Sequence, residues 1–283
     1  MSPARSVLVT GTSSGIGWAT ALRLDRLGFR VFAGVRRGED ADRLAAAASE
    51  RLVTLLLDVT DAGSIEAARV SVAEELGARS LDGIVNNAGY TSTSPMEFVD
   101  VDELRRQFEV NLFGAAAVVK AFLPHMTRPG GRIVNISSGA GRIVTPLLGP
   151  YCASKYALVA ISDAMRVELR GAGLAVSIVE PGFIETPMHE KNDARIAELL
   201  DSLPEIGRQR YGRALERLQA TNEKMSKTAA PAEDVARAVE KALSDARPRA
   251  RYPVTREARL LHWIGPFLTD RIRDAIFGRI VGL

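Results

Sequence analysis

The chain has 283 residues, of which 46% are hydrophobic and 25% are charged, a composition that excludes a disordered or fibrous protein. Its formal net charge is only +3 and the basic residues are scattered, so we expect no nucleic-acid partner. The single cysteine, Cys152, and three dispersed histidines exclude an intramolecular disulfide and offer no metal-ligand spacing. Because no apolar run approaches the ~20 residues that span a bilayer, we expect one cytoplasmic domain over residues 1–283.

Short apolar runs alternate with longer helical patterns along most of the chain. Strands are expected at residues 6–10, 30–35, 52–59, 81–86, 131–137 and 174–180, with a short seventh at 250–254. Helices are expected at residues 15–27, 39–49, 64–76, 101–126, 151–170 and 232–244. This alternation predicts an α/β fold, a doubly wound parallel sheet with helices on both faces.

A glycine-rich segment follows the first expected strand, where residues 10–17 read TGTSSGIG. Gly11, Gly15 and Gly17 would let backbone N–H groups approach a pyrophosphate at the start of the next helix. Such a segment alone could be a simple turn, but its place between a strand and a helix favours dinucleotide binding. The missing Gly-Lys-Ser/Thr ending argues against a nucleoside-triphosphate site.

The end of the second expected strand bears on the choice of dinucleotide. Arg36 and Arg37 stand there, and no acidic residue occurs before Glu39. A guanidinium pairs with a 2′-phosphate, whereas a carboxylate would accept hydrogen bonds from a free ribose. The sequence therefore favours NADP(H), with Arg36 as the main contact and Ser13 assisting, while NAD(H) stays possible. The alternative is that both arginines are solvated loop charges.

Three residues suggest acid–base chemistry. Tyr151 and Lys155 lie four residues apart in an expected helix and so share one face. A nearby ammonium favours the phenolate and brings a tyrosine toward a useful pKa. Ser138, at the end of the fifth expected strand, could donate to a substrate oxygen, with Ser137 as the competing candidate. Without Ser138, a surface Tyr–Lys pair would be the simpler interpretation.

Asn111 is a poor helix former within an apolar helical stretch. It is either a buried, satisfied amide or a group that holds water and links Lys155 to solvent. Cys152, next to Tyr151, is interpreted as a packing residue.

Two later segments depart from the alternation. Residues 187–228 are charged and helix-prone, and we interpret them as a substrate lid. Residues 256–283 form a helical extension with an apolar stripe interrupted by Pro266. We expect this stripe to pack on the body or on a partner subunit, and the disfavoured alternative is peripheral contact with a membrane surface. Its members are Leu260, Ile264, Leu268, Ile272, Ile276 and Ile280.

Taken together, these residues resemble the short-chain dehydrogenase/reductase family. The matching motifs are Thr10-Gly11-x-x-x-Gly15-x-Gly17, Asn86-Asn87-Ala88-Gly89, Asn111, Ser138, Tyr151-x-x-x-Lys155 and Pro181-Gly182-x-Ile184-x-Thr186. They occur in the family's order and extend over residues 5–186, and residues 231–235 resemble the start of the family's next helix.

The resemblance implies a Rossmann-type sheet of about seven strands in the order 3-2-1-4-5-6-7 and reversible hydride transfer with a nicotinamide cofactor. It makes Tyr151 the proton donor or acceptor, Lys155 its activator, Ser138 the group that polarises the carbonyl, and Asn111 part of a proton relay. The cofactor contacts that it implies, or that the residues above suggest, are Gly11, Ser13, Ser14, Gly15, Ile16, Gly17, Arg36, Arg37, Asp58, Val59, Asn87, Ala88, Gly89, Tyr151, Lys155, Pro181, Gly182, Ile184 and Thr186.

Within the family, residues 31–37, the lid and the tail look most like the hydroxysteroid and retinol dehydrogenase group. This implies an apolar secondary alcohol or ketone as substrate (steroid-, retinoid- or acyl-like) and a homodimer or homotetramer formed through the helices at 101–126 and 151–170. Candidate pocket walls are Tyr90, Leu147, Phe183, Met188 and Leu199. The competing hypotheses are a non-catalytic dinucleotide sensor, which predicts a broken Ser–Tyr–Lys set, and a sugar-nucleotide epimerase, which the compact glycine spacing disfavours.

Overall fold

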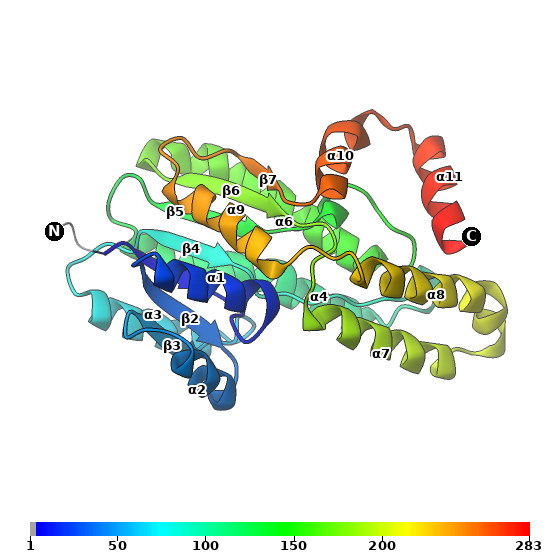
Figure 1. Cartoon of the computed structure of the whole chain (residues 1–283), viewed down its shortest axis with the longest axis horizontal. Coiled ribbons are helices and arrows are strands. Elements are labelled where there is room, and N and C mark those ends of the chain that lie inside the picture. The colour runs from blue at the N-terminus through cyan, green and yellow to red at the C-terminus, as the bar shows by residue number, and fades with distance from the viewer. Residues whose placement is uncertain (1–3) are drawn as a thin grey trace.

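Seven strands form one parallel sheet within residues 4–283, the part of the chain that the computed structural model describes. Their order is β3-β2-β1-β4-β5-β6-β7, which confirms the fold and strand order implied by the family resemblance (Figure 1). The strands are β1 (Ser6–Val9), β2 (Arg30–Val35), β3 (Leu52–Leu56), β4 (Gly83–Asn86), β5 (Arg132–Ile136), β6 (Ala175–Glu180) and β7 (Arg251–Pro253).

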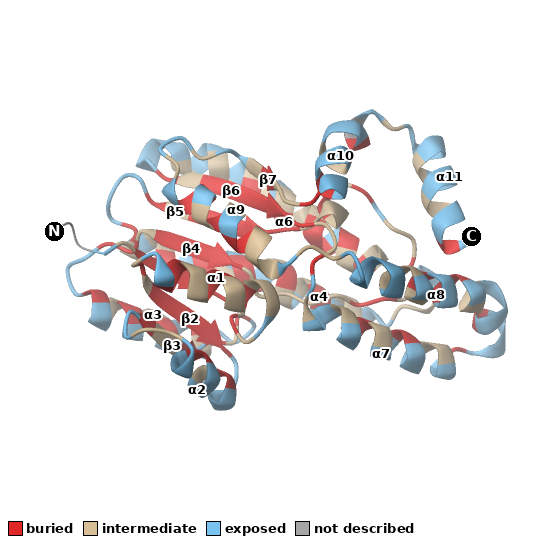
Figure 2. Cartoon of the chain, in the orientation of Figure 1, coloured by how far each residue is buried: buried red, intermediate tan, exposed pale blue. Residues whose placement is uncertain are grey.

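Helices cover both faces of this sheet because successive strand residues point to opposite sides. In β1, Val7 and Val9 pack into an apolar cluster with α1 and α9, while Leu8 packs into a second cluster with α3 and α5. Figure 2 shows the strands as the most continuously buried part of the molecule. The flanking helices are α1 (Gly15–Arg26), α2 (Gly38–Ala46), α3 (Ala62–Leu76), α4 (Val101–Phe108), α5 (Gly114–Phe122), α6 (Gly149–Glu168) and α9 (Ala232–Ser244).

Two element boundaries differ from the expectation. The single helix expected at 101–126 is interrupted between α4 and α5 by a π-helical turn, Glu109–Phe113, that contains Asn111. The third strand ends at Leu56, three residues early, because the Asp58 carboxylate accepts a hydrogen bond from the Thr60 N–H (2.9 Å) and turns the chain. Asp58 and Val59 therefore lie in the loop after β3.

The expected lid is a helical hairpin of α7 (Pro187–Ser202) and α8 (Glu205–Ser226). It lies beyond the carboxyl ends of the strands, to which the arrows point in Figure 1. The hairpin has an apolar cluster of its own, in which Ile196, Leu215 and Val281 are fully buried. This cluster joins the hairpin to the end of the chain.

The C-terminal extension consists of α10 (Arg256–Ile264) and α11 (Asp270–Val281), broken at Gly265–Phe267 as Pro266 predicts. The expected packing of its apolar stripe is only partly realised, because Ile264, Ile272, Ile276 and Ile280 remain 43–47% exposed. Figure 2 shows α10 and α11 mostly in the colour of exposed residues. Among residues 4–283 we find no helix with the length and apolar character needed to cross a membrane.

Candidate active site

The turn between β1 and α1 follows a path that requires glycine. Gly11 and Gly15 have φ angles of +68° and +55°, which side-chain-bearing residues rarely adopt. A Cβ on Gly11 would lie 2.8 Å from the Ala88 Cα, and one on Gly15 would lie 2.9 Å from the Thr186 Cγ2. The turn is therefore packed between the segments that follow β4 and β6. Its backbone, at the positive end of α1, suits a bound pyrophosphate.

Asn87 holds this turn in place. Its side-chain amide donates to the carbonyls of Thr10 (2.9 Å) and Gly11 (3.0 Å). The Thr10 hydroxyl in turn accepts from the N–H groups of Asn87 and Ala88, both at 3.0 Å. The Asn87 side chain thus positions the glycine-rich turn, which is a different task from the direct cofactor contact that the resemblance implies.

The arginines after β2 have unequal surroundings. Arg36 is exposed, whereas the Arg37 guanidinium pairs with the Asp40 carboxylate at 3.1 Å. Arg43, which the sequence reasoning missed, pairs with the same carboxylate at 3.0 Å and donates to the Ser13 carbonyl. Its guanidinium lies 5.2 Å from the centre of the Trp18 ring. No motif marks Arg43, because its position depends on how α2 packs beside the turn.

An open hollow of roughly 460 Å³ lies at this place, between α1 and α2. Ser13, Ser14, Trp18 and Arg43 line it. Two of the predicted cofactor contacts, Ser13 and Ser14, therefore face the same space as the arginine that was not predicted.

The structure brings the Tyr151–Lys155 pair together in the first turns of α6. The Lys155 ammonium lies 5.9 Å from the centre of the Tyr151 ring and donates to the Ile136 carbonyl at the end of β5 (2.9 Å). Ser138 follows β5 in extended conformation, and its hydroxyl accepts from the Ala140 N–H at 3.1 Å. The hydroxyls of Ser138 and Thr91 face the Tyr151 phenol.

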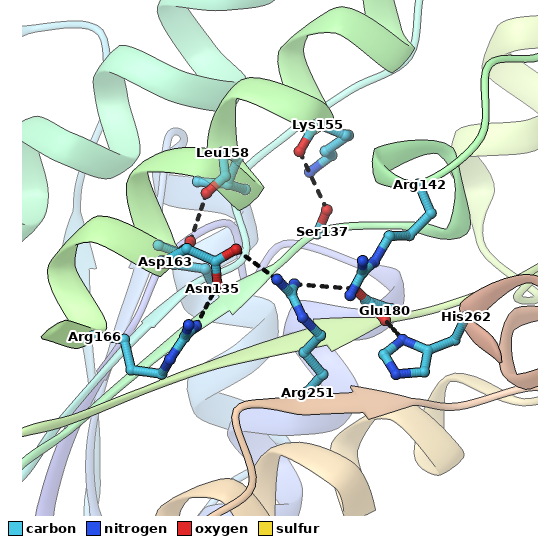
Figure 3. Close-up of polar contacts among 11 residues, drawn as sticks. Asn135, Ser137, Arg142, Lys155, Leu158, Asp163, Arg166, Glu180, Arg251 and His262 are labelled. Carbon is cyan, nitrogen blue, oxygen red and sulfur yellow. Dashed lines mark hydrogen bonds and ion pairs between the residues drawn. The ribbon is translucent and has the colours of Figure 1, made fainter. Parts of the chain in front are cut away.

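Ser137, the competing candidate, points into the interior. It is 3% exposed, and its hydroxyl is directed at the Lys155 carbonyl at 3.5 Å (Figure 3). Ser138 is half-buried at the edge of the sheet and is therefore the serine available to a substrate.

In the chain without cofactor, burial is the largest cause of the pKa shifts of Tyr151 and Lys155. It raises the pKa of Tyr151, and the hydroxyls of Ser138 and Thr91 oppose that rise. Burial also lowers the pKa of Lys155 to about 8. Lys155 is not among the groups that shift the pKa of Tyr151, so the expected lowering of that pKa by the ammonium is not seen in the chain without cofactor.

Asn111 is a buried amide whose hydrogen bonds are satisfied. Its oxygen accepts from the Tyr90 N–H (3.0 Å), and its nitrogen donates to the Tyr90 carbonyl and to the Ser154 hydroxyl, both at 3.0 Å. A Cβ on Gly89 would lie 3.1 Å from the Asn111 Oδ1 and 3.6 Å from the Lys155 Nζ. The side chain therefore fixes the 86–89 segment beside Lys155, and the π turn places it there. The proton-relay role remains a prediction.

The other predicted contacts lie along the same edge of the sheet. The Pro181 carbonyl accepts from the Gly139 N–H (2.9 Å), and Thr186 lies beside Gly15. Gly182 packs against Thr255. Ile184 and Val59 are only 2% and 6% exposed, so the surface of the chain offers a ligand little of either residue.

Two of the five predicted pocket walls instead join the hairpin core. Leu147 is 6% exposed and packs, with Leu199, into the apolar cluster of the hairpin. Leu147 has a φ of +69°, a strained conformation for leucine, which the surrounding cluster maintains.

Other predicted pocket walls lie where the hairpin begins. The Thr91 hydroxyl, which faces Tyr151, contacts the Met188 sulfur at 3.4 Å. The Phe183 ring stacks on His189 with ring centres 3.9 Å apart. The first turn of α7 therefore adjoins Tyr151. Thr91 was not predicted, since no sequence motif includes it.

These features define the class of protein. A glycine-rich dinucleotide turn, a Ser–Tyr–Lys set and the carboxyl edge of a doubly wound sheet are the parts of a nicotinamide-dependent oxidoreductase. Among the residues described, we find no group of three or more His, Cys, Asp or Glu side chains that could hold a metal ion.

Comparison with known proteins identifies the family. The family model of short chain dehydrogenases matches residues 5–197, and the chain belongs to this family of oxidoreductases. It is 36% identical to retinol dehydrogenase 5 of Mus musculus, over 95% of this chain and 86% of that protein. It is 33% identical to the NADPH-dependent 3-dehydrocapnine reductase of Ornithobacterium rhinotracheale, over 96% of each. Its fold matches the crystal structure of a short-chain dehydrogenase from Streptomyces avermitilis with a TM-score of 0.78 and 28% identity, over 99% of this chain and 98% of that one.

Proposed function

We propose that this enzyme interconverts a ketone and a secondary alcohol on an apolar substrate, with NADP(H) as its cofactor. The observation that carries the proposal is the convergence of Ser138, Tyr151 and Lys155 at the sheet edge that also holds the glycine-rich turn. When bound, the nicotinamide supplies or accepts the hydride. Gly11 and Gly15 adopt positive φ angles without strain and carry no Cβ that would keep a pyrophosphate from the backbone of the turn, so the residues present fit the cofactor.

Three side chains polarise the substrate and transfer its proton. In the reductive direction, the Ser138 hydroxyl donates to the substrate's carbonyl oxygen and polarises it. The Tyr151 hydroxyl gives its proton to the same oxygen. The Lys155 ammonium, held by the Ile136 carbonyl, stabilises the phenolate that remains. In the oxidative direction, the Tyr151 phenolate takes the proton from the alcohol.

The hairpin supports an apolar substrate and the role of a lid. Its first turn brings Met188 to Thr91, and Phe183 lies just before it. The ring of Tyr90, next to Thr91 in the chain, also contacts α7, because the Arg195 guanidinium lies 5.2 Å from its centre. A moving hairpin would cover an apolar molecule and exclude water. The similarity to a retinol dehydrogenase favours the same substrate class.

A substrate panel tests this proposal. Steroids, retinoids, acyl thioesters and sugars are assayed for oxidation of NADPH and NADH by the purified protein. We expect turnover with apolar ketones and little or none with sugars. Turnover restricted to sugars, or none with any carbonyl compound, would refute the proposed substrate class.

The proposed cofactor preference rests on the arginines that follow β2 and on Arg43 of α2. Arg36 is exposed and has no carboxylate partner among the ion pairs described for this region, while Arg37 and Arg43 share the Asp40 carboxylate. Arg43 donates to the Ser13 carbonyl and lines the hollow with Ser13 and Ser14, so it provides a second guanidinium beside the glycine-rich turn. We therefore assign the 2′-phosphate to Arg36, Ser13 and Arg43.

Changing Arg36 to Asp is expected to lower the preference for NADPH over NADH, measured as a ratio of kcat/KM values, by roughly ten- to a hundredfold. The reason is the loss of one charge-assisted hydrogen bond and the gain of a like charge. Arg247→Asp makes the same charge change in an exposed loop before β7, at the opposite edge of the sheet, and should leave the ratio unchanged. An unaltered ratio in Arg36→Asp would remove this residue from the site.

We also propose a cytoplasmic homo-oligomer formed through the α4–α5 and α6 helices. Phe113 between α4 and α5 is 53% exposed, and Val167 near the end of α6 is 70% exposed. Exposed large apolar side chains on neighbouring helices suit an interface between copies. Val167→Glu should shift the sedimentation coefficient toward that of the monomer at low concentration. A wild-type protein that sediments as a monomer would disprove the assembly.

A further inference from the structure

A buried carboxylate lies directly before the predicted cofactor segment. Glu180 ends β6 and is 1% exposed. One of its oxygens accepts from Arg142 Nε (3.0 Å) and Arg251 Nη1 (3.4 Å), and the other lies 2.9 Å from His262 Nδ1 (Figure 3). An isolated buried charge costs several kcal/mol, so these partners stabilise the ionised carboxylate. They come from three separate segments of the chain.

The first partner belongs to the loop of the catalytic serine. Ser138 begins the short helical turn Gly139–Gly141, and Arg142 ends it. The same loop is also tied through its backbone, since the Gly139 N–H donates to the Pro181 carbonyl at 2.9 Å. Two bonds, one from a side chain and one from the main chain, therefore fix the Ser138 loop to the end of β6.

The second partner connects this cluster with the helix of the catalytic tyrosine. Arg251 on β7 bonds both Glu180 and Asp163, the latter at 2.5 Å. Asp163 lies on α6, which also carries Tyr151 and Lys155. The cluster around Glu180 thus contacts both structural elements of the catalytic set.

The third partner comes from the C-terminal extension. His262 lies on α10, and its neighbours pack on the same loop. A Cβ on Gly139 would lie 3.8 Å from the Leu261 Cδ1, and one on Gly265 would lie 3.0 Å from the Ile143 Cδ1. Helix α10 therefore contacts the Ser138 loop by an apolar surface and also contacts Glu180 by a polar bond. The outer residues of the extension are exposed, whereas this inner face of α10 packs on the body.

We propose that the C-terminal extension is part of the active site's support, with His262 as a positioning residue that acts on Ser138 through Glu180 and Arg142. The inference rests on the proposed function, in which Ser138 orients the substrate oxygen. Loss of the His262 hydrogen bond leaves one Glu180 oxygen without a partner and makes the position of the carboxylate that binds Arg142 less well fixed. A catalytic group displaced by about 1 Å loses on the order of a hundredfold in rate, so a partial loosening should be visible in kcat.

The test compares two substitutions of one residue. His262→Phe keeps a flat ring but cannot hydrogen-bond, and it is expected to lower kcat roughly tenfold with the Kd for NADPH unchanged. His262→Gln restores a donor to the carboxylate and should recover most of the loss. His125→Phe, the same substitution in the short helix after α5, serves as the matched control and should keep wild-type kcat.

The outcomes separate the inference from the proposed function. Wild-type kcat in His262→Phe would overturn the inference, provided that the wild-type enzyme is active. A parallel loss of kcat, NADPH binding and thermal stability that glutamine does not rescue would also overturn it, because that pattern is general destabilisation. If the wild-type protein reduces no ketone, the failure belongs to the proposed function.

Discussion

Tyr151→Phe is expected to lower kcat for ketone reduction by roughly a thousandfold, because it removes the only proton that the proposed mechanism transfers from a side chain. The half-buried phenyl ring should still fill its place in α6, so the Kd for NADPH should change by no more than about twofold. Steady-state kinetics with the best ketone of the panel, together with NADPH binding followed by fluorescence, measure the two quantities separately.

A second tyrosine on the same helix provides the control. Tyr156 is also half-buried on α6, but it lines a different hollow, beside Arg142 and Arg273. Tyr156→Phe removes the same hydroxyl and should retain kcat within about twofold. Comparable kcat values for Tyr151→Phe and the wild-type protein would show that the phenol is not the acid.

Lys155→Met is expected to lower kcat by roughly a hundredfold or more, because the phenolate of Tyr151 loses its cationic neighbour. Methionine preserves the length of the buried stem and removes the charge. Lys120→Met, on the exposed face of α5, makes the same change away from the site and should have no effect on kcat. An active Lys155→Met enzyme would contradict the assigned role.

Comparing the wild-type protein with Lys155→Met at different pH values tests whether Lys155 is desolvated. The folded pKa of Lys155 is about 8 and its ordinary value is 10.5, so between these values the unfolded chain binds the extra proton. Raising the pH therefore favours the folded state. Without cofactor, the unfolding free energy of the wild-type protein relative to Lys155→Met should rise by about 2–3 kcal/mol between pH 7 and pH 10. Urea titrations measure it, and a flat or falling difference would mean that Lys155 is not desolvated.

The strands of the sheet could be predicted because the pattern that specifies each of them lies within a short stretch of sequence. In the sequence, each strand is a short apolar run that is followed by a helical pattern. Because the helices connect the strands in parallel, the carboxyl ends of all strands lie at one edge of the sheet. That rule alone places the glycine-rich turn and Ser138 at the same edge, whereas Tyr151 and Lys155 were marked by their helical spacing. The strand order itself came from the family resemblance, since the alternation alone does not determine it.

What the sequence did not reveal depends on distant partners. The break in the expected 101–126 helix occurs where Asn111 bonds the backbone of Tyr90, a contact between residues 21 positions apart. Arg43 meets Ser13 across 30 positions, and His262 meets Glu180 across 82. Periodicity in a short window carries no signal of such pairs, and one sequence without relatives offers no covariation to reveal them.

The packing of the C-terminal stripe illustrates the same limit. Its four-residue spacing correctly indicated helices and Pro266 their interruption, yet the body covers only part of the apolar face. A periodic apolar pattern predicts that a helix has an apolar face, but it does not identify the surface that packs against that face.

A crystal structure of the protein with NADP⁺ and a ketone or alcohol tests the central claim most directly. The account predicts the Tyr151 hydroxyl and the Ser138 hydroxyl within hydrogen-bond distance of the substrate oxygen, and the Lys155 ammonium on the nicotinamide ribose. A bound nicotinamide far from Tyr151, or a Lys155 side chain directed away from that ribose, would contradict it.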